Sequence, residues 1–248
     1  MERKLKWRLE SAGAEVIHDD EDFIVLNKPA NLLVIPDRYR HDLPNLQAIL
    51  TAELGKIFVV HRLDRETSGV VLFARTADAH ASLNAQFEGR LVEKVYAGIV
   101  IGEPQGEQGR IDNPLAESSI PGVMRVDRKG GKESVTEYRV LERFHGYSFL
   151  EMRPRTGRTH QIRVHLKSIG TPLMGDKIYG DGKPFLLSSV KSSYRSSGEE
   201  KPLLDRTALH AFALSFDHPR TGERSNHSVG LPKDMNSVLR YLRKFRAY

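Results

Sequence analysis

Residues 134–152 read SVTEYRVLERFHGYSFLEM, and this stretch indicates two antiparallel strands joined by a tight turn. Apolar and polar side chains alternate through Tyr138 and Val140, and a second apolar run, Tyr147–Met152, begins directly after Gly146. A period of two is typical of a strand with one buried face, and a glycine between two such runs marks a hairpin.

Other short apolar runs predict further strands, and three segments with helical spacing predict helices. The predicted strands are Phe23–Leu26, Ile57–His61, Val70–Ala74, Val95–Ile101 and Ala208–Phe216, and the predicted helices are Ala77–Phe87, Thr159–Ser168 (capped by Thr159) and Asp234–Tyr248. Segments 102–109 and 188–201 are predicted to be a loop and an exposed, Ser-rich insertion. Hairpins without regular strand–helix alternation favour an α+β fold, a largely antiparallel mixed sheet flanked by helices and loops.

Composition excludes several classes of protein. The chain has 248 residues, 39% of them hydrophobic, which excludes a disordered or fibrous protein. It has no cysteine, which excludes disulfides, thiol nucleophiles and thiolate metal sites. No apolar run is long enough to span a membrane and no secretory signal is visible, so we expect a cytoplasmic protein. No linker interrupts residues 15–248, which we expect to form one catalytic domain after an N-terminal extension, residues 1–14.

A polar loop with the sequence HRLDRETSG, residues 61–69, lies between two predicted strands. Its Asp64 stands between Arg62 and Arg65, and guanidinium neighbours keep a carboxylate ionised and available as a nucleophile or base. The alternative is that Asp64 only organises the turn together with Thr67 and Ser68. The charge pattern alone favours this second interpretation.

A basic segment, RPRTGRTHQIRVHLK, covers residues 153–167. Between residues 128 and 167 there are ten Lys and Arg against four Asp and Glu. A helix beginning near Thr159 would place His160, Arg163 and Lys167 on one side, either as a solvated basic face or as a surface that binds phosphate or a catalytic carboxylate. The five-residue spacing of His160 and His165 argues against a zinc site.

Taken together, these segments resemble the RluA-type family of RNA pseudouridine synthases. The matching residues, in the family's order, are Asn27-Lys28-Pro29, the loop from His61 to Gly69, Lys94-x-Tyr96-Ala97, Thr156-Gly157-Arg158-Thr159-His160-Gln161-Ile162-Arg163-Val164-His165-Leu166, Gly170-x-Pro172, Gly175-Asp176, Tyr179-Gly180, Leu209-His210-Ala211 and His218-Pro219. The match extends from about residue 15 to residue 232. The resemblance implies the pseudouridine synthase catalytic fold, with a central cleft.

The resemblance also implies an activity, in which selected uridines in structured RNA are isomerised to pseudouridine. Asp64 matches the catalytic nucleophile, and attack on C1′, attack on C6 and a glycal route all stay open. Tyr96 matches the tyrosine that stacks on the uracil, and Arg163 matches the arginine that pairs with the catalytic carboxylate. The implied substrate contacts are His61, Arg62, Arg65, Thr67, Arg158, His160, Gln161, Ile162 and Leu209.

The family implies ribosomal or transfer RNA as the partner, a monomer, and neither metal nor cofactor. Too few residues precede Asp20 for the small RNA-binding domain that many members carry, so we expect the catalytic body to choose the target. Two other classes stay open, namely a non-catalytic RNA-binding protein of the same fold and a hydrolase. A hydrolase would need a second acid such as Glu66 at a fixed separation from Asp64.

Overall fold

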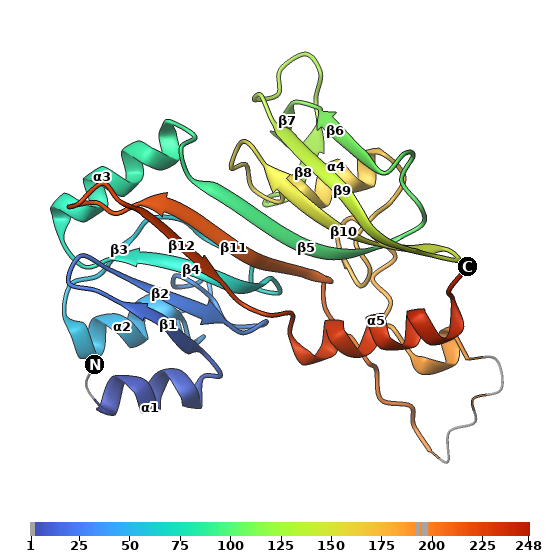
Figure 1. Cartoon of the computed structure of the whole chain (residues 1–248), viewed down its shortest axis with the longest axis horizontal. Coiled ribbons are helices and arrows are strands. Elements are labelled where there is room, and N and C mark those ends of the chain that lie inside the picture. The colour runs from blue at the N-terminus through green and yellow to red at the C-terminus, as the bar shows by residue number, and fades with distance from the viewer. Residues whose placement is uncertain (1–2, 192–193, 195–197) are drawn as a thin grey trace. The chain divides into compact units, whose positions relative to one another are not determined.

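The computed structural model describes residues 3–191, 194 and 198–248, and the chain forms two compact units (Figure 1). Unit 1 consists of Met1–Lys94 and Ala211–Gly230, and unit 2 consists of Val95–His210 and Leu231–Tyr248. Each unit contains strands of an antiparallel sheet and a hydrophobic core of its own.

The sheet of unit 1 has the strand order β1-β2-β4-β11, with β3 also paired to β4 and β12 to β11. The strands are β1 (Glu15–Asp19), β2 (Phe23–Lys28), β3 (Phe58–Val59), β4 (Ser68–Ala74), β11 (Leu209–Asp217, entering from unit 2) and β12 (Arg224–Ser228). Every residue of β4 is buried, and so is nearly all of β2. Strands buried on both faces read as continuous apolar runs, which is why the sequence revealed these two.

Three helices belong to unit 1: α1 (Arg3–Ser11), α2 (Leu46–Leu54) and α3 (Ala77–Glu88). The side chain of Thr76 caps α3 by accepting the backbone N–H of Ala79, and Asn45 caps α2 in the same way. Helix α3 packs on β4 through the same cluster as Leu72, whereas α1 contacts α2 and β1. Helix α3 therefore covers part of the sheet of unit 1, and α1 packs between α2 and strand β1.

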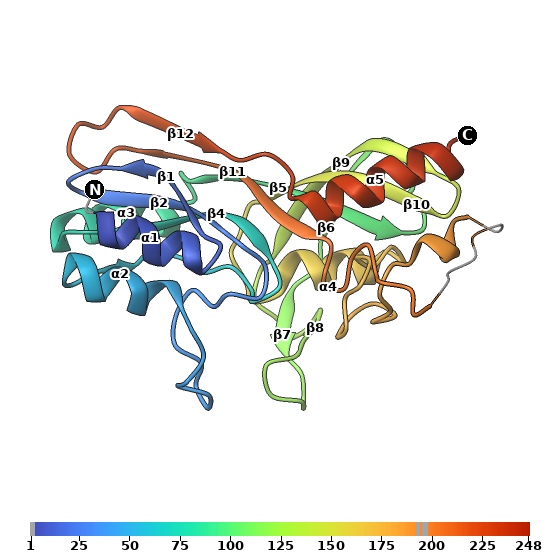
Figure 2. The ribbon, with the colours of Figure 1, turned by 90° about the horizontal axis from the view of Figure 1, so that it is seen from below.

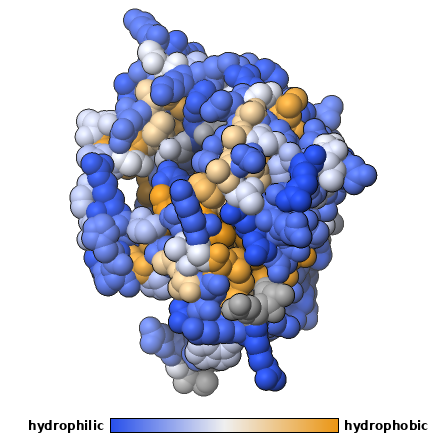
Figure 3. Space-filling view, turned by 90° about the vertical axis from the view of Figure 1, so that its left-hand side faces the viewer, coloured by the Kyte–Doolittle hydropathy of each residue, from blue (hydrophilic) through white to orange (hydrophobic). Residues whose placement is uncertain are grey.

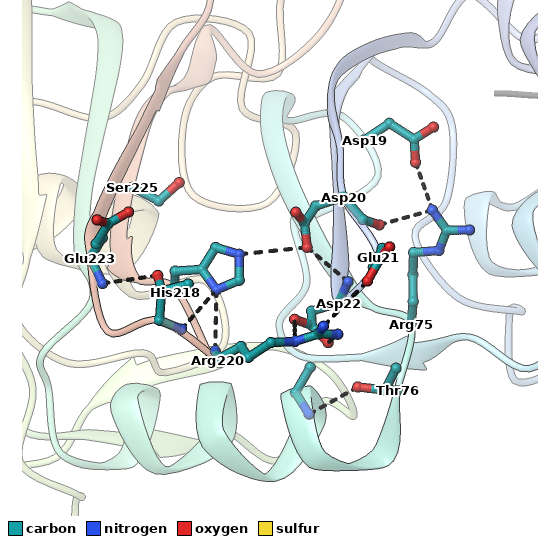
Figure 4. A network of polar contacts seen from close by, with 12 residues as sticks. Asp19, Asp20, Glu21, Asp22, Arg75, Thr76, His218, Arg220, Glu223 and Ser225 are labelled. Atoms are coloured by element: carbon teal, nitrogen blue, oxygen red, sulfur yellow. Dashed lines mark hydrogen bonds and ion pairs between the residues drawn. The ribbon is translucent and has the colours of Figure 1, made fainter.

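Two turns of unit 1 are joined by a polar network (Figure 4). The β1–β2 turn contributes Asp20 and Asp22, and the β11–β12 turn contributes His218 and Arg220. Nε and Nη2 of Arg220 donate to the two carboxylate oxygens of Asp22 at 2.7 and 2.8 Å, and Nε2 of His218 lies 3.6 Å from Oδ1 of Asp20. The network fastens the two hairpin ends together.

The strands of unit 2 form an antiparallel sheet in the order β5-β10-β9-β6. They are β5 (Glu93–Ile101), β6 (Gln108–Asp112), β9 (Val135–Phe144) and β10 (Tyr147–Pro154), and a separate hairpin is formed by β7 (Leu115–Glu117) and β8 (Met124–Val126). The predicted hairpin over 134–152 is confirmed as β9–β10, with Gly146 at a φ of 81° in its turn. Only glycine adopts such a φ without steric cost.

Helices cover both faces of this sheet (Figure 2). Helix α4 (Gln161–Ser168) packs on one face through Ile162 and Leu166, and α5 (Lys233–Phe245) packs on the other through Val238 and Leu239. A short 3-10 turn, η1, covers Leu187–Ser189. The predicted C-terminal helix is thus confirmed, with its end at Phe245.

One local prediction was wrong, and two others were right only in part. Thr159 does not cap α4, because His160 occupies that position with a φ of 53°. The predicted loop over 102–109 contains the first residues of β6, which pairs with β9 although it has few apolar side chains. Within 188–201, Val190 is buried in the α5 core, so the segment is not simply an exposed insertion; its residues 192–193 and 195–197 lie outside the described part.

The surface is mostly polar. Figure 3 shows one face, on which hydrophilic residues predominate and hydrophobic residues form smaller patches between them. Among the described residues, no helix combines the length and the apolar character needed to cross a bilayer.

Candidate active site

The loop that carries Asp64 in unit 1 is a tight turn placed directly before the buried strand β4. The backbone oxygen of Asp64 accepts the N–H of Thr67 at 3.1 Å. The side chain of Thr67 is buried, that of Asp64 is partly exposed, and those of Arg62 and Arg65 are exposed. The turn therefore places the partly exposed Asp64, flanked in sequence by two exposed arginines, directly before a fully buried strand.

A buried lysine that sequence reasoning did not select holds this turn. Lys28 is 0% exposed, and its ammonium group donates to the backbone oxygens of Pro29, Leu32 and Arg65 at 3.0, 2.8 and 3.1 Å. A lysine ammonium has three protons, so three carbonyl acceptors match its capacity. The N–H of Asn31 donates to the same Arg65 oxygen at 2.8 Å. Lys28 thereby ties the Asp64 turn to the end of β2.

His61 stands at the start of the same loop and faces inward. Its Nε2 accepts the N–H of Leu72 at 3.1 Å, which requires that nitrogen to be unprotonated, and its ring stacks on Phe87 at 5.0 Å. Burial, together with the charge of Lys94, lowers the pKa of His61 from 6.5 to about 3. Burial also lowers the pKa of Lys94 from 10.5 to about 8. His61 is thus a neutral residue that joins β4 to α3, and its contact with substrate stays a prediction.

In unit 2, three of the predicted site residues meet in one apolar cluster. Tyr96 on β5 lies opposite Met152 of β10, and its partly buried ring packs into the cluster that holds Ile162 and Leu209. Ile162 and Leu209 are only 6% and 4% exposed. The aromatic ring therefore rests on an apolar support, which is the setting that favours stacking with a nucleobase.

Arg163 is buried in unit 2, so the solvated basic face, one of the two interpretations of this helix, does not apply to it. It is 7% exposed, and its Nε and Nη2 donate to the two oxygens of the fully buried Asp176 at 2.7 and 2.9 Å. Its guanidinium carbon lies 5.0 Å from the centre of the Tyr179 ring. Burial acts to raise the pKa of Asp176, but hydrogen bonds and charge from Arg163, with two backbone N–H donors, hold it below 3.8. The Asp176 carboxylate is therefore ionised at neutral pH.

The side chains of His160 and Gln161, at the start of α4, form hydrogen bonds within the protein. Nδ1 of His160 lies 2.8 Å from the Tyr179 hydroxyl. The side-chain amide of Gln161 donates to the Val135 oxygen at 2.9 Å and accepts from the hydroxyl of Thr156 at 2.6 Å. Gln161 thereby fastens the loop before α4 to β9, and a substrate contact stays a prediction for both residues. Arg158 is exposed.

Comparisons with known proteins identify the family of this chain. The model of the RNA pseudouridylate synthase family matches residues 22–168. The chain belongs to the RluA-type family of RNA pseudouridine synthases. It is 37% identical over 246 residues to ribosomal large subunit pseudouridine synthase D of Pseudomonas aeruginosa, covering 97% of this chain and 75% of that protein. The corresponding Zymomonas mobilis protein is 36% identical over 239 residues, covering 92% and 72%.

A solved structure shows the same fold. Human RNA pseudouridylate synthase domain containing 4 superposes with a TM-score of 0.72 and 26% identity, covering 96% of this chain and 97% of that one. The chain is therefore an RNA pseudouridine synthase, an isomerase with the α+β fold of its family, and its substrate is RNA. The non-catalytic alternative is not favoured.

Three residues of this pseudouridine synthase were missed as functional candidates: Lys28, Asp176 and Tyr179. Each stands inside a segment that matches the family, but the local sequence pattern does not show that a buried lysine collects three carbonyls or that Asp176 binds Arg163. Among the described residues, one group, Asp20, Asp22 and His218, has metal-ligand geometry. Arg220 already neutralises Asp22 there, so the group is explained without an ion.

Proposed function

We propose that this pseudouridine synthase modifies ribosomal RNA of the large subunit, and that Asp64 is its catalytic nucleophile. The substrate rests on the names of the relatives, which cover nearly the whole chain at 36–37% identity. Transfer RNA is the alternative substrate. We further propose that the protein is a cytoplasmic monomer, and that residues 15–248 act as one catalytic domain after the extension 1–14.

The single observation that carries the role of Asp64 is its place on an anchored turn between two exposed arginines. In the reaction, the N1–C1′ glycosidic bond of a uridine breaks, the uracil rotates, and a C5–C1′ bond forms; C5 loses its proton and N1 takes one up. An anionic oxygen held by a rigid backbone can attack without first reorganising. Arg62, Arg65 and Thr67 on the same loop are the residues proposed to contact the nucleotide.

In this proposal the uracil of the target uridine stacks on the ring of Tyr96. A uridine in folded RNA has to leave its stack to expose C1′, which costs a few kcal/mol. Stacking on an aromatic side chain returns ~1–3 kcal/mol per base. The support is the partly buried Tyr96 ring, backed by Ile162 and Leu209 within unit 2.

Arg163 is proposed to pair with the catalytic carboxylate. The pair with Asp176 uses Nε and Nη2 of Arg163. A guanidinium fixed in this way can present an edge to a second carboxylate and keep it ionised. Arg158 and His160, at the start of α4, are proposed to contact the RNA beside it.

The substrate is tested by mapping pseudouridines in total RNA from cells with and without the gene. Pseudouridine-specific chemical adducts stop primer extension, so each modified position gives a signal. We expect a signal in large-subunit ribosomal RNA to disappear without the gene and to return when the gene is restored. Loss of signals only in transfer RNA would show that transfer RNA is the substrate instead. An unchanged map would contradict the proposed activity on ribosomal RNA.

A further inference from the structure

Three side chains in unit 2, those of Asp176, Tyr179 and His160, are linked to the guanidinium group of Arg163 directly or through one another. Asp176 accepts hydrogen bonds from Nε and Nη2 of Arg163, and the centre of the Tyr179 ring lies 5.0 Å from the guanidinium carbon. The Tyr179 hydroxyl accepts the N–H of Met124 at 2.8 Å and contacts Nδ1 of His160 at the same distance. The guanidinium is thus held both within its plane and across its face.

The carboxylate of Asp176 is itself held by backbone. Its Oδ1 accepts the N–H groups of Ile178 and Tyr179 at 2.9 and 3.0 Å in addition to Nη2 of Arg163. Asp176 is 0% exposed, so water does not compete for these oxygens. A charge-assisted, bidentate pair is the geometry that fixes a guanidinium most firmly. The same short segment, 176–179, supplies both the carboxylate and the ring.

The backbone of His160 supports a positioning role for this set. His160 has a φ of 53°, a left-handed conformation that a side chain with a Cβ seldom adopts, and it begins the helix that carries Arg163. Residues held in sparsely populated conformations persist only where their surroundings over-determine them. The hydrogen bond to Tyr179 is one such restraint.

We propose that Asp176 and Tyr179 are positioning residues for Arg163, which set the orientation of the guanidinium edge that meets the catalytic carboxylate. This inference rests on the proposed role of Arg163. Asp176 restricts rotation of the Arg163 guanidinium group within its own plane. The Tyr179 ring restricts movement of that group perpendicular to the plane. Neither residue touches the reacting atoms.

The first test replaces Asp176 by Asn, which keeps the shape and removes the charge. Single-turnover rate at saturating RNA and the Kd for the same RNA are measured on the full chain with a large-subunit ribosomal RNA transcript. We expect the rate to fall about 100-fold, as for an ångström-scale misplacement, with a Kd within about threefold of wild type. A wild-type rate in the folded variant would overturn the proposal.

The matched control is Asp22→Asn, because Asp22 is buried and makes an equally short bidentate pair, with Arg220 in unit 1. Its thermal midpoint should also fall, though by less because the Arg220 side chain is exposed, while its single-turnover rate stays within about threefold of wild type. Equal losses of rate in the two variants would show a general cost of breaking an ion pair, and would overturn the positioning role.

A double-mutant cycle separates this inference from the role of Arg163. If Asp176 acts through Arg163, Asp176→Asn should change the rate by less than about threefold in an Arg163→Met background, because interacting residues are non-additive. A full additional loss would overturn the inference. Full activity of Arg163→Met alone would instead overturn the proposed role of Arg163.

Tyr179 provides a second test should Asp176→Asn not fold. Tyr179→Phe keeps the ring under Arg163, whereas Tyr179→Leu keeps only apolar packing. We expect the Leu variant to lose about tenfold or more in rate, and the Phe variant, which keeps the ring but loses the hydroxyl contacts with His160 and Met124, to lose clearly less, with unchanged Kd in both. Equal rates in the two folded variants would overturn the part assigned to the ring.

Discussion

At the residue scale, the candidate site depends on buried charges that are fully bonded rather than on exposed ones. Lys28 and Asp176 are both 0% exposed, and each collects several hydrogen bonds. Burying a charge is costly unless it is paired and hydrogen-bonded. Such groups fix the positions of their partners, which here are the turn of Asp64 and the guanidinium of Arg163.

Replacing Lys28 by Met should destabilise the protein by about 3 kcal/mol, because buried carbonyls lose their donor while the cost of burying the cation also disappears. The Arg65 oxygen keeps its bond from Asn31, which limits the loss. Urea unfolding of both proteins measures the difference. The control is Lys56→Met at an exposed lysine, expected to change stability by about 0.5 kcal/mol or less. Equal effects of the two substitutions would contradict a stabilising role for the hydrogen bonds of Lys28.

At the element scale, strand β4 is the support of the Asp64 loop. It is buried along its length, and its Leu72 N–H is joined through His61 to Phe87 of α3. His61 therefore belongs to the packing between a strand and a helix, and its protonation state is part of the stability of unit 1.

The stability of the protein should fall with acidification because of His61. Its pKa is about 3 in the folded protein and about 6.5 when unfolded, so between these values the unfolded chain binds the extra proton. Each pH unit lost in that window removes about 1.4 kcal/mol. Urea unfolding of wild type and His61→Gln at about pH 6 and about pH 5 measures this. Other groups cancel in the comparison, and identical pH slopes would show that His61 does not contribute.

At the scale of the whole molecule, the chain carries 38 Lys and Arg against 32 Asp and Glu. Many of these cations are already paired on the sheet of unit 2, as Arg155 is with Glu137 and Arg139 with Glu151. The exposed basic residues, among them Arg158, Arg62 and Arg65, are the groups available to bind RNA phosphates.

RNA binding should therefore weaken with salt, because each neutralised phosphate releases a counterion. We expect the Kd for a large-subunit ribosomal RNA transcript to rise by at least about tenfold between about 50 and about 200 mM monovalent salt. Filter binding across this range gives the slope. An affinity that is flat with salt would exclude a phosphate-tracking surface.

The sequence predicted the parts of the fold that have a local period. The β9–β10 hairpin and α5 were found because alternate or helically spaced residues meet one core. Helix α1 was missed because only Leu5 and Leu9 mark its buried side within a charged run. Strand β6 was missed because its stability comes from pairing with β9.

The site was predicted less completely, for a related reason. Helical spacing left two interpretations of Arg163 open, a solvated basic face or a surface that binds phosphate or a carboxylate, and it could not show that Asp176, thirteen residues later, is a partner. Lys28 binds the carbonyl of Arg65, which lies 37 residues later in the chain. Contacts of this kind depend on tertiary structure, and only the resemblance pointed to the residues concerned.

The most direct test of the account is pseudouridine formation by Asp64→Asn on large-subunit ribosomal RNA, with Glu66→Gln on the same loop as the control. Asn keeps the size of the side chain and removes the anionic oxygen. We expect RNA binding to stay within about threefold and the single-turnover rate to fall by at least about 10³-fold, while Glu66→Gln stays near wild type. A near-wild-type rate for Asp64→Asn would contradict the assignment of the nucleophile.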